Sequence, residues 1–188
     1  MTDLFDAIRE RRTIRRFRSE PVTEEQLTTV LEAVRWAPSW ANTQCWHVVV
    51  VRDGERKAQL QTILGRNPAH NAMVDADVVL VLCAQQGRAG FKEGEPTTAF
   101  GDWLMYDVGL ANQNLCLAAH GLGLGTVIAG NFDHAAVGAE IGLPEDYVAL
   151  TMIPLGHPAS DAKAPPRREL SEQVHRERFG SAWGKLED

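Results

Sequence analysis

Residues 98–120 restrict the fold of this chain more than any other segment. Apolar residues recur there at helical spacing and form one stripe: Leu104, Val108, Ala111, Leu115, Ala118 and Ala119. Leu110 and Leu117 face other directions, and a helix that is apolar on more than one side must be buried on more than one side. We therefore expect a long helix that ends near Gly121 and lies either at the centre of the domain or in a subunit interface.

Shorter patterns on both sides of this segment predict further helices and strands. A capping box formed by Thr23 and Gln26 begins a helix that Pro38 ends, and Asp133 caps another. Helices are also expected over residues 3–11 and 55–65, and strands over 46–52, 77–84, 126–129 and 147–154. This irregular alternation, without a repeat or a linker, predicts one α+β domain spanning residues 1–188, with helices around a mixed sheet.

Two segments are expected to lie outside this regular structure. Residues 85–97 are rich in glycine and charge and are expected to form a mobile loop. The tail from Pro158 to Arg168 is rich in proline and basic residues, and we interpret it as an extended arm. A short helix is expected to start after it, at Ser171.

The composition is typical of a globular protein and argues against a membrane protein. At 188 residues, with 44% of them hydrophobic, the chain is long enough to bury roughly 70% of its unfolded surface. Its longest apolar runs, residues 48–51 and 78–84, fall short of the ~20 residues that a membrane helix needs. The N-terminus shows no apolar signal core, so we expect a cytoplasmic protein with no membrane partner.

The three cysteines form no recognisable disulfide or metal pattern. Cys45, Cys83 and Cys116 are odd in number and widely spaced, which indicates neither a disulfide framework nor a zinc site. Cys116 and His120 lie four residues apart in the long helical segment and could face one metal ion. Because a third ligand is missing, we favour a core thiol beside a helix-terminal histidine and expect no metal site.

Basic residues are concentrated near the N-terminus. Residues 1–18 contain six arginines and three acidic residues, whereas the whole chain carries a net charge of −6. A dense basic cluster on an acidic protein indicates a site for a compact anion and argues against a nucleic-acid partner. Arginine suits such a site because its planar guanidinium donates two hydrogen bonds to one phosphate. A solvated helix end, where the helix dipole favours arginine, explains the segment equally well.

A second polar cluster follows the helix that Pro38 ends. Residues 38–46 read Pro-Ser-Trp-Ala-Asn-Thr-Gln-Cys-Trp and combine hydroxyl and amide groups with two tryptophans. Such groups can hydrogen-bond the heteroatom edge of a planar ring, and tryptophan supplies a flat apolar wall. The alternative is an ordinary loop that uses Ser39 and Asn42 for turn hydrogen bonds, and the segment alone favours that alternative.

Several catalytic and cofactor motifs are excluded. Gly121, Gly123 and Gly125 lack the G-x-G-x-x-G spacing and follow a helix rather than a strand, which excludes a Rossmann site. The sequence contains neither a G-x-S-x-G nucleophile elbow nor an H-E-x-x-H zinc motif. No set of side chains forms an evident general acid–base pair, so we predict no catalytic side chain.

Taken together, four segments resemble those of the nitroreductase family, the FMN-dependent NAD(P)H oxidoreductases. Residues 11–17 resemble the family's R-[RH]-[ST]-x-[RK]-x-F, and residues 38–46 resemble its P-S-x-x-N-x-Q-x-W. The third segment is the long helix with Asp107 and Asn114, which runs into Gly-Leu-Gly, and the fourth is the Leu-Gly-His-Pro at 155–158. The resemblance implies the family's fold: an α+β domain with a mixed sheet flanked by helices, a long central buried helix and an extended C-terminal arm.

The resemblance also implies which residues bind FMN. In the family, the first motif binds the phosphate and ribityl chain, and the second lies against the isoalloxazine from the other subunit. The segment after Gly-Leu-Gly offers backbone groups near N5, and the basic tail closes on the phosphate. The residues implied here are Arg11, Arg12, Thr13, Arg15, Pro38, Ser39, Trp40, Asn42, Ile128, Ala129, Gly130, and Arg167 or Arg168. Two residues depart from the family pattern: Cys45 stands where proline is common, and Asn131 where glycine is common.

The implied activity is a ping-pong hydride transfer through the flavin. NAD(P)H, as NADH or NADPH, reduces FMN and leaves, and a small planar acceptor such as a nitroaromatic or a quinone then takes the hydride. The implied assembly is a homodimer with FMN at the interface, which the long apolar helix and the extended tail also favour. Two other classes stay open. One is a flavin-binding carrier or redox-responsive protein with little turnover, and the other is a cofactor-free domain whose arginines bind an acidic partner.

Overall fold

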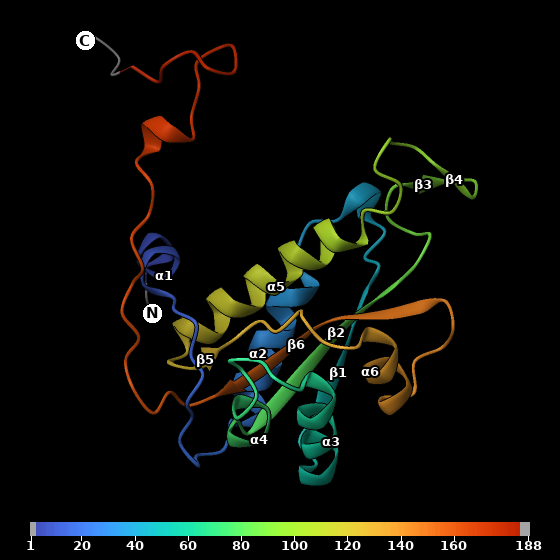
Figure 1. Ribbon diagram of the computed structural model, residues 1–188, viewed down its shortest axis with the longest axis vertical. Coiled ribbons are helices and arrows are strands. Elements are labelled where there is room, and N and C mark those ends of the chain that lie inside the picture. Colours follow the sequence, from blue (N-terminus) through green and yellow to red (C-terminus); the bar gives the residue numbers. More distant parts are fainter. Residues whose placement is uncertain (1–2, 185–188) are drawn as a thin grey trace.

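The computed structural model describes residues 3–184. Its helices and strands are α1 (Leu4–Glu10), α2 (Glu24–Arg35), β1 (Trp46–Val51), α3 (Gly54–Leu64), α4 (Ala72–Asp75), β2 (Val78–Gln85), β3 (Phe91–Lys92), β4 (Glu95–Pro96), α5 (Leu104–Gly121), β5 (Gly125–Thr126), α6 (His134–Glu140) and β6 (Tyr147–Gly156). Short 3₁₀ helices occur at Trp40–Asn42 and Leu170–Glu172. Figure 1 shows the C-terminal segment extending away from the body that the other elements form.

The sheet is four-stranded, with the strand order β1-β2-β6-β5 and antiparallel pairing between neighbours. Val81 in the central strand β2 lies opposite Val49 of β1 and Met152 of β6. A parallel bridge between Thr13 and Thr126 adds the N-terminal segment to the β5 edge, which makes that edge mixed. The predicted α+β fold, a sheet flanked by helices, is confirmed.

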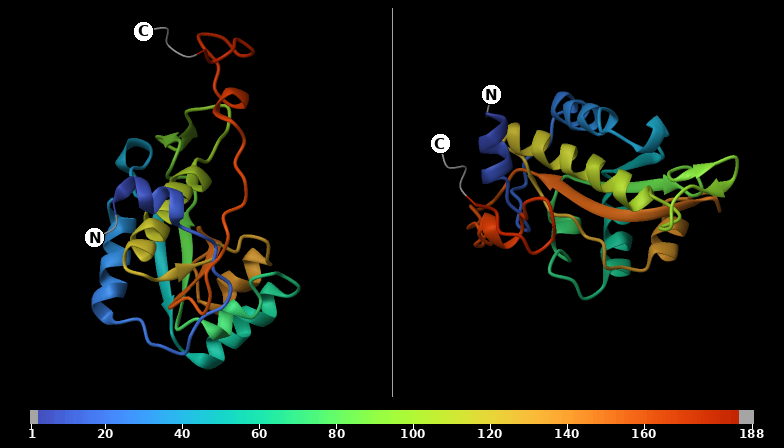
Figure 2. Two further views of the ribbon diagram at one scale, coloured as in Figure 1. Left: turned by 90° about the vertical axis from the view of Figure 1, so that its left-hand side faces the viewer. Right: turned by 90° about the horizontal axis from the view of Figure 1, so that it is seen from above.

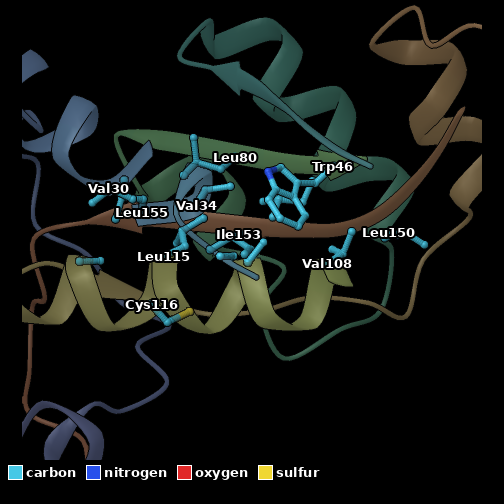
Figure 3. Packing of buried hydrophobic residues seen from close by; sticks show 14 of the residues in the cluster. Val30, Val34, Trp46, Leu80, Val108, Leu115, Cys116, Leu150, Ile153 and Leu155 are labelled. Atoms are coloured by element: carbon cyan, nitrogen blue, oxygen red, sulfur yellow. The ribbon is translucent and has the colours of Figure 1, made fainter. Parts of the chain in front are cut away.

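Helices cover both faces of this sheet (Figure 2). Leu80 and Leu82 of β2 point toward α2 and α5, whereas Val79 and Val81 point toward α3, α4 and α6. Both sets are fully buried because successive strand residues face opposite sides of a sheet and both sides are covered. In Figure 3, Leu115 of α5 points toward the sheet beside Ile153 of β6.

The long helix predicted over residues 98–120 is present as α5, but it begins at Leu104. The residues before it are held by the chain that follows β2. Trp103 N donates to Ala89 O at 3.0 Å, and the Asp102 carboxylate accepts from Gly87 N at 2.8 Å and from Leu104 N at 2.9 Å. The segment predicted as a loop at 85–97 has more structure than expected, since it contains the antiparallel pair β3–β4.

The faces of α5 differ in burial. Most of the predicted apolar stripe is buried against the sheet and α2: Leu104, Val108, Ala111, Leu115 and Ala119. On another side, the side chains of Met105 and Tyr106 are 62% and 59% exposed. One chain therefore leaves part of this helix uncovered.

The N-terminal segment and the C-terminal arm lie side by side at the edge of the body. Ile14 N donates to Thr126 O at 2.8 Å, and Arg18 N donates to His157 O at 2.8 Å. Beyond residue 159 the arm runs away from the sheet, and Phe179 on it is 95% exposed. The predicted extended arm is confirmed. Within the described range of 3–184, no helix is both long and apolar enough to cross a membrane.

Candidate functional site

The arginine segment, residues 11–15, leaves α1 as extended chain along the β5 edge. Because side chains alternate along extended chain, residues 11, 13 and 15 share one side and residues 12 and 14 share the other. Arg11, Thr13 and Arg15 line a pocket of about 200 Å³ together with Ile128. Ile14 instead packs inward, against a glycine at residue 125.

The glycine at residue 125 allows the segment to approach the sheet this closely. A Cβ atom built on Gly125 would lie 2.8 Å from the Cβ of Ile14, which is shorter than a van der Waals contact. Together with the hydrogen bond from Ile14 N to Thr126 O, this contact fixes the register of the segment on β5. The positions of Arg11 and Arg15 are therefore set by packing on the opposite side of the backbone.

Arg12 points away from the pocket that Arg11 and Arg15 share. Its Nη1 donates to Arg9 O at 2.5 Å and to Arg11 O at 2.8 Å, which folds its side chain back on α1. It lines an adjoining pocket of about 400 Å³ with His120, which Arg11 also lines, and a third pocket of about 300 Å³ with Arg9 and Arg167. The tail thus brings Arg167 beside Arg12, while Arg168 lines none of these three pockets.

The arginines of this region have no acidic partner. Among the ion pairs of residues 3–184, none involves Arg11, Arg12 or Arg15. Glu10 and Asp161 line the 400 Å³ pocket, but no acidic residue lines the 200 Å³ pocket. Uncompensated positive charge in a protein of net charge −6 fits an anionic ligand such as a phosphate.

Residues 128–130 follow β5, and Ile128 lines this pocket. Ala129 is buried, and its N–H and C=O groups both pair with Met152 at 2.9 Å. Its backbone is therefore used by the sheet and is not free for a ligand. Ile128 and Gly130 alternate with it and are exposed, so they present the surface that a ligand could contact. Asn131 is exposed as well.

The polar turn, residues 38–45, lies at the other end of α5. Trp40 N donates to both carboxylate oxygens of Asp107, at 3.1 Å each. Asp107 stands nine residues before Cys116, which lines the arginine pocket, and this separation corresponds to about 13 Å along the helix. Pro38 and Asn42 are exposed, and Ser39 and Trp40 are half-buried. Within one chain, the turn and the arginine segment line no common pocket among those described above.

The buried thiols of Cys45, in the turn, and Cys116, beside the arginine pocket, are held in the neutral form. Burial raises the pKa of Cys45 to about 12, and it also raises the pKa of Cys116 despite the opposing charge of Arg11. A protonated thiol is a poor nucleophile, so neither cysteine is suited to covalent chemistry. Cys116 and His120 both line the 400 Å³ pocket, but no cluster of three or more potential metal ligands occurs in the part of the chain that is described.

Sequence reasoning missed three residues that line the arginine pocket: Gln113, Cys116 and Thr126. Gln113 is exposed on α5 and lines the pocket with the segment, and it could have been noticed within the polar run of residues 112–114 in this helix. Thr126 reaches the site only because Thr13 pairs with it across the sheet edge. No local pattern predicts a pairing between residues so distant in sequence.

Comparisons with known proteins place the chain in a family. The sequence profile described as the nitroreductase family matches residues 8–157, which include the arginine segment, the polar turn and α5. The FMN reductase (NAD(P)H) of Bacillus subtilis is 32% identical over 200 residues, covering 95% of this chain and 75% of that protein. A NADH dehydrogenase of Thermus thermophilus is 33% identical over 198 residues, covering 92% and 95%.

A solved structure agrees with these sequence matches. The NADPH:FMN oxidoreductase of Vibrio harveyi, complexed with NAD⁺, superposes with a TM-score of 0.81 at 31% identity, covering 95% of this chain and 78% of that one. The chain belongs to the nitroreductase family.

Proposed function

We propose that this chain is a single-domain FMN-dependent oxidoreductase that takes electrons from NAD(P)H. The observation that carries the proposal is the row of Arg11, Thr13 and Arg15 along one pocket, without an acidic partner. A flavin phosphate carries close to two negative charges. Charge-assisted hydrogen bonds from arginine contribute roughly 1.5–3 kcal/mol each, so two of them contribute roughly 3–6 kcal/mol to retention of the cofactor.

The residues around this pocket fit the other parts of FMN. Thr13 offers a hydroxyl for the ribityl chain, and the exposed surface of Ile128 and Gly130 suits a flat ring. Arg12 and either Arg167 or Arg168 would add positive charge from the tail side. When bound, FMN supplies the redox chemistry, by accepting a hydride from NAD(P)H and passing it to an acceptor.

The polar turn is proposed to contact the flavin of a partner subunit in a homodimer. Its outward residues Pro38 and Asn42 are exposed. The turn lies beside Asp107 at one end of α5, whereas the pocket of Arg11 lies near Cys116 toward the other end, so the two line no common pocket within one chain. The uncovered face of α5 with Tyr106, and the exposed Phe179 on the arm, supply apolar surface for such an interface. Both parts of the site would then meet across the dimer interface.

The proposed reaction is a ping-pong transfer in which NAD(P)H and a planar acceptor, a nitroaromatic or a quinone, use one site in turn. The protein's part is to hold the ring, limit access to one planar molecule and keep competing nucleophiles away. The raised pKa of Cys45 and Cys116 fits this role because neither thiol is reactive at neutral pH. No side chain is assigned to proton transfer, since water can supply the proton to the reduced acceptor.

The proposal is tested by the absorption spectrum of the purified protein before and after anaerobic addition of NADPH. Flavin bands that bleach within seconds are the expected result. Bands that persist with both NADPH and NADH would favour a flavin carrier, and a protein that takes up no added FMN would refute the cofactor assignment. Steady-state rates with NADH and a quinone should give parallel double-reciprocal lines; intersecting lines would contradict a shared site.

A further inference from the structure

The backbone of the polar turn is strained. Ala41, Asn42 and Gln44 have φ values of 44°, 56° and 47°, although none of them is glycine. Side chains with a Cβ atom rarely adopt this left-handed region, and alanine has no side-chain hydrogen bond to offset the cost. Three such residues within four positions persist only where surrounding contacts hold the backbone in place.

Asp107 on α5 supplies those contacts from outside the turn. Its side chain is fully buried, and its two oxygens accept the N–H of Trp40 at 3.1 Å each. The thiol of Cys45 donates to Oδ2 of the same carboxylate at 3.8 Å. One rigid helix residue thereby binds both ends of the strained stretch.

The carboxylate has no counter-ion to explain its burial. Within residues 3–184, Asp107 takes part in no ion pair, and burial raises its pKa. The hydrogen bonds from Trp40 N–H and the Cys45 thiol lower the pKa of this carboxyl and so favour its charged form, whereas the nearby carboxylate of Asp102 raises it. A buried charge without a cation is costly, so this position is poorly explained by stability alone.

The strain sets the direction of the residues that face outward. Ser39 Oγ accepts the N–H of Gln44 at 3.0 Å and closes the turn. Ala41 and Asn42, which carry positive φ, are exposed. A relaxed turn would bring these side chains to different positions, because a change from left-handed to right-handed backbone redirects the chain within a few residues.

We propose that Asp107 is a positioning residue that holds the polar turn in the conformation in which Trp40 and Asn42 contact FMN. It acts through the Trp40 N–H and the Cys45 thiol and does not itself touch the cofactor. This inference rests on the proposed function, because it requires that the turn meets the flavin of the partner subunit.

The test compares wild-type protein with Asp107→Ala and Asp107→Asn, and with Cys83→Ala as a matched control. Cys83 is a fully buried thiol in β2 that packs in the other core cluster, on the α3 side of the sheet, whereas Cys45 packs on the α2 side. Three quantities are measured: hydrogen exchange of the Trp40 amide in the apoprotein, the dissociation constant for FMN by fluorescence, and the midpoint potential of bound FMN.

In Asp107→Ala we expect Trp40 to exchange at least about tenfold faster, and FMN to bind about tenfold more weakly, as befits a lost hydrogen bond to a charged group. The midpoint potential should shift, because the turn no longer holds its groups against the ring. Asp107→Asn keeps one oxygen for Trp40 N–H and should restore most of the amide protection. Cys83→Ala should leave all three quantities near wild type.

A second pair of variants keeps the inference testable if Asp107→Ala does not fold. Cys45→Ala removes one donor to Asp107 and should loosen the turn to a smaller extent, whereas Cys45→Ser retains a donor and should not. Faster exchange at Trp40 with unchanged FMN affinity and potential would overturn the inference and leave Asp107 a structural residue. Wild-type protein that binds no FMN would instead refute the proposed function, since the variants are judged against a wild type that binds.

Discussion

The arginine segment and the polar turn present ligand-facing residues by opposite means. The arginine segment is unstrained extended chain, placed by pairing with Thr126, and it carries positive charge without acidic partners. The polar turn carries no charged side chain and holds three residues at positive φ against a buried carboxylate. The arginine segment therefore presents positive charge from an unstrained backbone, whereas the polar turn presents uncharged groups whose positions are fixed by a strained backbone. We therefore expect substitutions in the two regions to weaken FMN binding for different reasons, loss of charge in the first and loss of the fixed backbone conformation in the second.

The largest effect is expected from removing the two arginines of the shared pocket. Arg11→Ala combined with Arg15→Ala deletes two charge-assisted hydrogen bonds of roughly 1.5–3 kcal/mol each, so FMN affinity should fall by about 10²- to 10⁴-fold. Fluorescence titration of the apoprotein measures the loss. Arg16→Ala is the matched control, because Arg16 is exposed in the same stretch of chain and does not line the pocket. An equal loss in the control would mean that net charge, rather than these positions, binds the phosphate.

A smaller effect is expected from moving the arginine segment without touching its charges. Gly125→Ala places a Cβ 2.8 Å from Ile14, and such overpacking costs about 1–3 kcal/mol of stability. The displaced segment should bind FMN about tenfold more weakly, measured by the same titration. Adding Ile14→Ala removes the clashing side-chain branches and should restore part of the affinity. Gly54→Ala serves as control, since no atom lies within 4 Å of its added Cβ; an affinity unchanged in Gly125→Ala would show that the register of the segment is unimportant.

How much of this site was predictable differs between the two regions. The arginine segment and the turn could be recognised as polar clusters from the sequence because charge and composition are local properties, and their roles in binding FMN stay predictions. The roles of Asp107 and Thr126 were not predictable, because each depends on contact between segments far apart in the chain. Most helices and strands followed from periodicity and caps. One exception is the start of α5, where a tertiary hydrogen bond from Trp103 N to Ala89 O replaces a helical one. Others are the β3–β4 pair in the predicted loop and β5, which ends at Thr126 although a strand was expected over 126–129.

The thiols of the turn and the core should affect stability only at alkaline pH. Burial raises the pKa of Cys45 from 9.0 to about 12, so above pH 9 the unfolded chain loses this proton while the folded chain keeps it. The stabilisation is therefore complete below pH 9 and is lost progressively as pH rises toward 12. Between pH 8 and 10, Cys45→Ser should lose about 1.4 kcal/mol less unfolding free energy than wild type, measured by denaturant titration of the apoprotein. Equal losses would show that the thiol titrates normally in the folded turn.

The smallest effect, and the sharpest separation of the two regions, is expected from salt. Raising ionic strength from about 0.05 to about 0.5 M shortens the screening length and weakens attraction between the exposed arginines and an anion, so the FMN dissociation constant of the wild type should rise by several-fold. The contribution of Asp107 is made through hydrogen bonds inside the protein, which salt screens much less. The ratio of dissociation constants between Asp107→Ala and wild type should therefore stay constant across the series, whereas the ratio for the Arg11 and Arg15 double variant should shrink as salt rises. If both ratios fell together, the turn would also act through charge. The distinction between electrostatic binding by the arginine segment and conformational positioning by the turn would then be wrong.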